Sequence, residues 1–493
     1  MTPQGFPFLS AAVEPGPAAA AVQVLTPRAR CARAGGKGCQ PVSAARAAAM
    51  FARFDANSDG RVDFDEFARA WCEPVVPALA ETETMYKDIE TIWAELTTRP
   101  GLEVPPVKLL KSKWLSERAR KIRAAGSAEE RRKLALPRRQ DLERTEPEAF
   151  YTYEEVKALK RGSENAGQPM RVIAISHCWE TAEHPDPEGA NLIQFVDAME
   201  RATKIAATNG QHTWQRLPDN MAVFFDYCSL FQKSPDGTPR SPMENAAFKA
   251  ALSRMQVWYA HQLTTCFFLT QPPEGSTTLP YMERGWPTFE YNVSMLAKTV
   301  TSSGWPQLFD ISLGVDRIFQ RPPPLSTAEL RKLLNSKHFT NGADKDLVAA
   351  LYEKTAMTTV QGAARITFSS IGWGPAQIAQ FTEQWLPLTK NLEAISFTSN
   401  PIGAEGAKLI CDALRCGNCP KVIFLNMFNN QLGDEGADHL IEFLHFRNKH
   451  NTESGGVLVA PLLTTLRTGR NQISTSKTLE LEEVCRSYKI KLE

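Results

Sequence analysis

Two stretches near the C-terminus decide the fold class of that region: residues 391–407, NLEAISFTSNPIGAEGA, and residues 421–437, KVIFLNMFNNQLGDEGA. Both place apolar residues at the second, fifth and seventh positions, an asparagine at the tenth and Gly-Ala at the end. The alternating apolar run predicts a short strand, and the residues after it predict a helix. A unit that recurs every 20 to 50 residues or so indicates a solenoid of stacked strand–helix units.

The repeat pattern continues on both sides of these stretches. Apolar residues at helical spacing follow each copy, as Ile410 and Leu414 do after the first. A third partial copy follows an insertion near residues 451–456, and a degenerate copy precedes the first one. We therefore assign residues 364–493 to the array. The outer copies are marked by Leu463, Leu466, Asn471 and Ile473, and by Ile366, Phe368, Trp373, Gly374, Phe381 and Trp385.

Residues 364–475 resemble leucine-rich repeats of the ribonuclease-inhibitor type. The resemblance implies inward apolar strand residues, an Asn side chain that satisfies the turn backbone, and a helix behind each strand. It also implies a protein partner bound on the strand face. The alternative is an array that only caps the middle domain. Cys416 and Cys419, with Cys411 as a third ligand, are too few for zinc, so we interpret them as loop and core residues.

A second motif, residues 55–66 with the sequence DANSDGRVDFDE, predicts a calcium site. Ca²⁺ binds about six to eight oxygen atoms. Gly60 stands where such a loop turns sharply and needs a positive φ. The candidate ligands are the side chains of Asp55, Asn57, Asp59, Asp63 and Glu66 and the backbone carbonyl of Arg61.

Residues 43–73 resemble the EF-hand family, with helices expected on both sides of the loop. The resemblance implies Ca²⁺ as the cofactor and a change in helix orientation when it binds. The apolar side chains of Phe51, Phe54, Phe67 and Trp71 would then dock on a partner or on another part of the chain. We find no second loop of this kind, and an acidic surface turn is the alternative.

Residues 148–300 alternate predicted strands with predicted helices. The strands are expected at 171–176, 221–226 and 264–270, and the helices at 190–209, 244–261 and 287–298. This alternation predicts a parallel sheet covered by helices. Functional residues of such sheets lie in the loops at the carboxyl ends of the strands.

Those loops carry Ser176 with Cys178 and Trp179, then Asp226 with Cys228 and Gln232, and finally the segment Arg284-Gly-Trp286-Pro-Thr-Phe-Glu290. In this order they resemble the heterokaryon-incompatibility (HET) domain and the related TIR domains. The resemblance implies Glu290 as the catalytic carboxylate of an NAD-cleaving enzyme, with Ser176, Asp226, Arg284 and Trp286 beside it and Trp179 on the cofactor.

Cleavage of the nicotinamide–ribose bond passes through an oxocarbenium-like state, which a carboxylate stabilises. The alternative is structural, with Glu290 paired to Arg284 and both tryptophans in a core. A cysteine hydrolase is excluded, because neighbours such as His177 and Cys178 point to opposite faces of a strand.

The remaining segments are expected to be a tail and two linkers. Residues 1–42 are Ala-, Pro- and Gly-rich, which indicates a disordered tail or an organelle-targeting peptide. Residues 74–147 are expected to be a helical basic linker, since 108–139 hold twelve Lys or Arg against three Glu. This segment could also be a membrane-surface or calmodulin-target helix. Residues 301–363 are expected to be a helical linker with a capping box at Ser326 and Glu329.

Composition limits the class of protein. The 493 residues suffice for about three domains. A net charge of +1 gives no general attraction to nucleic acid or a membrane. No apolar run is long enough to span a bilayer. The ten scattered cysteines indicate reduced thiols and a cytoplasmic location.

The sequence thus predicts a multidomain α and α/β protein with a helical EF-hand, a central parallel-sheet domain and a short repeat solenoid. The function we expect is calcium binding in a modular signalling and interaction protein. The alternatives are a calcium-regulated NAD-cleaving hydrolase and a passive scaffold with a structural calcium site. Association with further copies of the chain is left open.

Overall fold

The computed structural model describes residues 85–159, 170–208, 220–276, 278–298, 308–312, 321–453 and 456–493. The chain divides into two units, Met1–Glu73 and Pro74–Glu493, and every described residue belongs to the second. The predicted tail and the predicted calcium loop at 55–66 lie outside the described residues.

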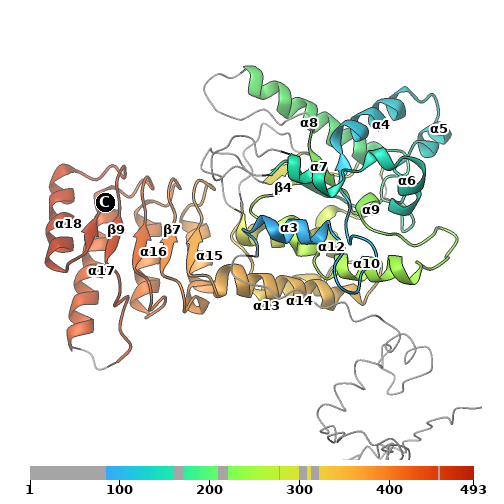
Figure 1. Ribbon diagram of the computed structural model, residues 1–493. Helices are drawn as coiled ribbons and strands as arrows, with labels where there is room; N and C mark the ends of the chain where they lie inside the picture. The colour runs from blue at the N-terminus through green and yellow to red at the C-terminus, as the bar shows by residue number, and fades with distance from the viewer. Residues whose placement is uncertain are drawn as a thin grey trace, which may run out of the picture. The chain divides into compact units, whose positions relative to one another are not determined.

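The first sheet has five strands in the order β1-β3-β2-β4-β5. Figure 1 labels its strand β4 and the helices around the sheet. The last four strands are mutually parallel, and β1 pairs with β3 in the antiparallel sense. The chain runs from β2 outward to β3 and then back to β4 on the other side of β2. Such a reversal opens a crevice at the carboxyl ends of β2 and β4. The strands are β1 (Leu110–Lys111), β2 (Val172–Ser176), β3 (Ala222–Phe224), β4 (Thr265–Phe268) and β5 (Leu308–Asp310).

Helices cover both faces of this sheet, as the apolar strand sequences require. Alternate residues of β2 point to opposite faces, so Ile173 and Ile175 pack with α4 (Ser112–Ala124) and α8 (Ala190–Thr208). Val172 and Ala174 pack on the other face with α11 (Met255–Ala260) and α12 (Gly285–Ala297). The other helices are α3 (Ile89–Glu95), α5 (Ala128–Lys133), α6 (Arg139–Thr145), α7 (Tyr153–Ala158), α9 (Asp226–Ser229), α10 (Pro242–Leu252), α13 (Thr327–Asn335) and α14 (Asp344–Ala356), with short turns at Pro147–Ala149, Tyr281–Glu283 and Met357–Gln361.

The basic segment is part of the α/β core, which differs from the predicted linker. Its strand β1 pairs with β3, and α4 buries Leu115, Ala119 and Ile122 against the sheet. These residues recur at helical spacing, and the many charges around them hide that spacing in the sequence. Its cations pair with acids of the same domain, as Arg131 does with Glu188 at 2.9 Å.

The segment predicted as a second linker also joins the core. Leu330 and Leu334 of α13 are buried in the same cluster as Phe289 of α12. The predicted capping box is confirmed, because the Ser326 hydroxyl accepts from the Glu329 amide and the Glu329 side chain reaches back to Ser326.

The helix predicted over 244–261 is instead two helices, α10 and α11. The chain leaves the helical conformation at Arg254, whose φ is −129°. The Arg254 guanidinium donates to the fully buried carboxylate of Glu95 at 3.1 Å. The turn between the helices therefore places a cation where α3 buries an acid.

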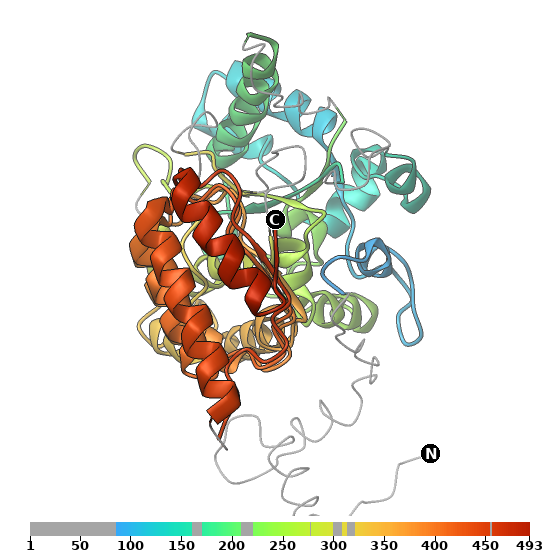
Figure 2. The same ribbon diagram turned by 90° about the vertical axis from the view of Figure 1, so that its left-hand side faces the viewer.

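The second sheet is the predicted repeat array, with parallel strands in the order β10-β9-β8-β7-β6. Its helices form one layer and its strands another (Figure 2). The outer copies predicted from degenerate sequence form β6 and β9, and β10 extends the sheet further. The strands are β6 (Arg365–Thr367), β7 (Ala394–Ser396), β8 (Phe424–Asn426), β9 (Thr465–Arg467) and β10 (Lys491–Leu492), and the helices are α15 (Pro375–Gln384), α16 (Gly403–Arg415), α17 (Gly433–Glu453) and α18 (Thr475–Ser487), with a 3₁₀ turn at Leu386–Leu388.

Buried asparagines link successive repeats. The Asn471 side chain accepts from the backbone amide of Asn430 at 2.5 Å and donates to the carbonyls of Met427 and Thr468 at 2.7 and 2.6 Å. Asn400 bonds to the preceding turn in the same way. Asn400 and Asn471 therefore each satisfy backbone groups of two repeats at once, which an apolar core cannot do.

Candidate functional sites

A buried polar cluster lies at the carboxyl end of β2. Ser176 ends the strand on the face covered by α12, so its hydroxyl meets Glu290 of that helix. The Ser176 hydroxyl donates to Glu290 Oε2 at 2.5 Å and is hydrogen-bonded to the Tyr281 hydroxyl at 2.5 Å. The structure therefore brings two of the predicted catalytic residues together, with a tyrosine that the sequence motifs did not indicate.

This cluster is closed to solvent. Glu290 is 6% exposed and Ser176 is 0% exposed. Burial raises the pKa of Glu290 well above its ordinary value, the bond from Ser176 opposes this shift, and the charge of Asp226 adds to it. Burial therefore favours the protonated form of Glu290, and a substrate could reach this acid only after the covering residues moved.

Asp226 and Trp179 meet beyond the carboxyl ends of β3 and β2. The Trp179 indole NH donates to Asp226 Oδ2 at 2.8 Å, and the amide of Tyr227 donates to Asp226 Oδ1 at 2.7 Å. The Trp179 ring packs edge-on against Tyr227, with 5.5 Å between centroids. The carboxylate thus fixes the orientation of the half-buried indole.

The predicted Arg284 and Trp286 point to different neighbours. Arg284 Nη2 donates to the Thr278 hydroxyl at 2.6 Å, and that hydroxyl donates to the Trp179 carbonyl at 3.1 Å. The Trp286 indole NH donates to Asp344 Oδ2 of α14 at 2.9 Å. Arg284 is thereby linked through Thr278 to the backbone of Trp179, whereas Trp286 connects α12 to α14.

His177 and Cys178 lie on opposite faces of the sheet, as strand geometry requires. The His177 ring lies 4.7 Å from the Phe225 ring, while Cys178 packs in the cluster on the α12 face. Burial lowers the pKa of His177 and raises that of Cys178 to about 11. These shifts favour neutral imidazole and thiol, so the two groups form no thiolate–imidazolium pair.

The N-terminus of α8 is capped from within the chain. Asp186 Oδ1 and Oδ2 accept from the amides of Asn191 and Leu192 at 3.0 and 2.8 Å. Helix N-termini bind anions through such amides. Here the fully buried Asp186 occupies these donors, which leaves them unavailable to a phosphate.

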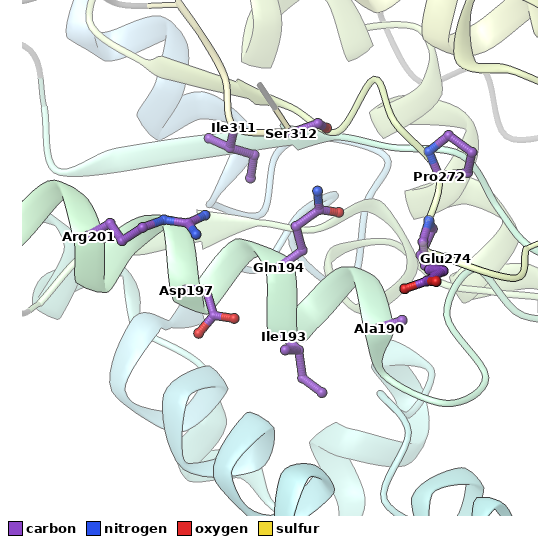
Figure 3. A pocket seen from close by; sticks show the side chains of 10 residues that line it. Ala190, Ile193, Gln194, Asp197, Arg201, Pro272, Glu274, Ile311 and Ser312 are labelled. Carbon is purple, nitrogen blue, oxygen red and sulfur yellow. The ribbon is translucent and has the colours of Figure 1, made fainter. Parts of the chain in front are cut away.

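A hollow of about 540 Å³ lies beside this helix, at the carboxyl ends of β4 and β5 (Figure 3). It contains none of the predicted site residues, because its walls come from three segments without a shared motif. Asp197 on its wall is already paired with Arg123. The lining residues are Ala190, Ile193, Gln194, Asp197, Arg201, Pro272, Pro273, Glu274, Ile311 and Ser312.

An aromatic and cationic patch lies on the strand face of the repeats. The Arg467 and Arg470 guanidinium carbons lie 4.9 and 5.7 Å from the centre of the half-buried Phe428 ring. Both arginines are exposed. We call Phe428, Arg467 and Arg470 the Phe428 patch. The sequence repeats predicted a binding face here but did not single out these residues.

Within the described residues, no group of three or more His, Cys, Asp or Glu side chains is arranged to hold a metal ion. Cys419 is buried, and Cys416 is exposed. In the same part of the chain, no helix is both long and apolar enough to cross a membrane.

Comparison with known proteins bears on the C-terminal array. Leucine-rich repeats are present. The family model described as "Leucine Rich repeat" matches residues 390–411 and 418–440. These matches lie in the second and third strand–helix units of the array and include β7 with part of α16 and β8 with part of α17. No curated protein matches the chain. The repeat family is commonly a protein-binding module.

Proposed function

We propose that this chain is a modular interaction protein that binds a protein partner on the strand face of its repeats and binds Ca²⁺ through residues 55–66. The observation that carries the first part is the exposed Phe428 patch. A ring with two exposed arginines over it offers apolar area and hydrogen-bond donors together, and both features are enriched at protein interfaces.

Selection of peptides from a random display library tests partner binding. The full chain is the bait, and Thr398→Trp adds bulk on the strand face while Leu479→Trp adds the same bulk on α18. We expect enriched peptides that bind wild type and Leu479→Trp and that bind Thr398→Trp at least about tenfold more weakly. Enrichment of no peptide, or equal binding to both variants, would contradict the proposal.

The support for calcium binding is the donor set of the sequence. Five side chains and one carbonyl, from Asp55 to Glu66, supply hard oxygen ligands at the spacing that a twelve-residue calcium loop requires. Calcium would neutralise this acidic loop and reorient the flanking helices. A passive scaffold, in which the ion is only structural, predicts the same partner affinity with and without chelator.

A second candidate function is cleavage of NAD⁺ by the α/β domain. It is favoured by the strand order, because the reversal beside β2 gathers Ser176, Asp226 and Glu290 near one edge. Water would add to the ribose carbon as nicotinamide leaves, yielding ADP-ribose and a proton. The burial of Glu290 opposes this function. Nicotinamide release by wild type that Glu290→Gln abolishes would establish it, and no release from either would leave the binding function alone.

A further inference from the structure

The Phe428 patch has the geometry of a site for carboxylates. The guanidinium groups of Arg467 and Arg470 both lie over the Phe428 ring, and cation–π contact limits their freedom before a ligand arrives. Among the described residues, neither guanidinium forms an ion pair with an acidic side chain. Their planar forks match carboxylates in two-bond contacts.

The absence of a side chain at residue 469 creates space for the ring. A Cβ on Gly469 would lie 3.0 and 3.1 Å from two atoms of the Phe428 ring. The ring would have to shift by a few tenths of an ångström to admit it. Gly469 therefore allows the Phe428 ring to lie close to the backbone of the next repeat, within reach of both arginines.

The charge of the surrounding face suits an acidic ligand. The outward positions of β6 to β9 hold Arg, Thr, Ala, Ser, Phe and Asn and no acidic residue. The nearby Glu493 carboxylate is paired with Lys491 at 2.5 Å. The hydrogen bond from Lys491 and the charges of Lys491 and Arg467 lower the pKa of Glu493, so nearby cations offset this carboxylate.

We infer that the Phe428 patch binds an acidic segment of a partner protein, with two carboxylates on Arg467 and Arg470 and an apolar side chain against Phe428. This inference rests on the proposed function of the repeats and names its ligand class. An acidic peptide is favoured over nucleic acid, because the chain has a net charge of only +1 and the patch has only two arginines.

The test is fluorescence anisotropy of the full chain with a labelled peptide that carries Asp, Glu and Leu. A matched peptide carries Asn, Gln and Leu. The variant Arg467→Gln/Arg470→Asn removes both charges, and it keeps the turn because Asn429 already adopts the left-handed conformation of Arg470 in the preceding repeat. The control Arg486→Gln/Lys489→Asn removes two charges from the α18 region, one of them also at a left-handed residue.

We expect the acidic peptide to bind wild type and the control equally. The double patch variant should lose at least about tenfold in affinity, because two charge-assisted bonds are removed. Gly469→Ala should weaken binding while both arginines remain, because the ring is displaced. Circular dichroism melting checks that each variant is folded.

Equal binding of the neutral peptide, tighter binding of a single-stranded oligonucleotide, or full affinity of the double variant would overturn the inference. Full affinity of Gly469→Ala would overturn the role of the ring. If display selection instead yields peptides without acidic residues that still require the strand face, the proposed function stands and this inference fails.

Discussion

The Ser176 hydroxyl donates a 2.5 Å hydrogen bond to the buried carboxyl group of Glu290, and this contact joins the end of β2 to α12. A proton on Glu290 avoids placing an unpaired charge in the core. The raised pKa therefore makes the stability of the fold depend on pH, and it also limits the chemistry that Glu290 can perform.

Replacing Glu290 by Gln should weaken the pH dependence of stability. The folded-state pKa is raised, so the contribution of Glu290 is full below its ordinary pKa and is lost as pH rises toward the raised value. Gln keeps the shape of the neutral acid and cannot ionise. Denaturant unfolding at pH 5 and pH 8 should show a smaller loss of stability for Glu290→Gln than for wild type. The account of Glu290 as a buried acid would be refuted if Glu290→Gln lost as much stability between pH 5 and pH 8 as wild type. It would also be refuted if the control Glu393→Gln, at an exposed residue, reduced this loss equally.

Replacing Asn471 by Ala should destabilise the array by about 2–3 kcal/mol, because it leaves buried backbone groups of two repeats without partners. Asn391→Ala, at an exposed residue, should change stability by no more than about 0.5 kcal/mol. Thermal unfolding of both variants makes the comparison. Similar melting temperatures would show that the asparagines do not hold the repeats together.

Replacing Lys298 by Met should lower the free energy of unfolding by about 2 kcal/mol, because the carbonyls of His261 and Thr264, just before β4, lose their donor. The buried ammonium donates to His261 O at 2.6 Å, Thr264 O at 2.5 Å and Thr264 Oγ1 at 2.8 Å. Lys449→Met on α17 removes an exposed ammonium and should have little effect. Equal unfolding midpoints in urea would mean that Lys298 does not anchor this segment.

Replacing Glu66 by Gln should abolish the heat of Ca²⁺ binding, because the last loop position would lose its two-oxygen carboxylate. Asp65→Asn removes a charge from the neighbouring position, which supplies no ligand, and should bind within a few-fold of wild type. Calorimetric titration compares the three proteins. Identical heats in wild type and Glu66→Gln, or no heat in wild type, would contradict calcium binding by this loop.

The repeats could be predicted from the sequence because each residue type has a fixed structural role. Ile395 and Leu425 must point inward, and Asn400 and Asn430 must meet the turns, so even the worn outer copies could be placed. The strand β10 could not, because Lys491–Leu492 is too short to show a period.

The main strands of the α/β domain could be predicted from the sequence. The place of β1, α4 and α13 in the core of this domain could not, and these elements lie in segments predicted as linkers. The apolar stripe of α4 is obscured by the surrounding Lys and Arg residues, so its place in the core follows from the sheet that it covers. Tyr281 and Gly469 show no sequence signal, because their roles depend on Ser176 and Phe428, which lie far away along the chain.

The central claim is that the strand face of the repeats is a partner-binding surface. A selected peptide that carries a photo-crosslinking group tests it most directly, with mass spectrometry of the cross-linked full chain. We predict cross-links within 394–399, 424–429 and 465–470 and their loss in Thr398→Trp. Cross-links confined to the helices α16 to α18 or to the α/β domain would contradict the claim.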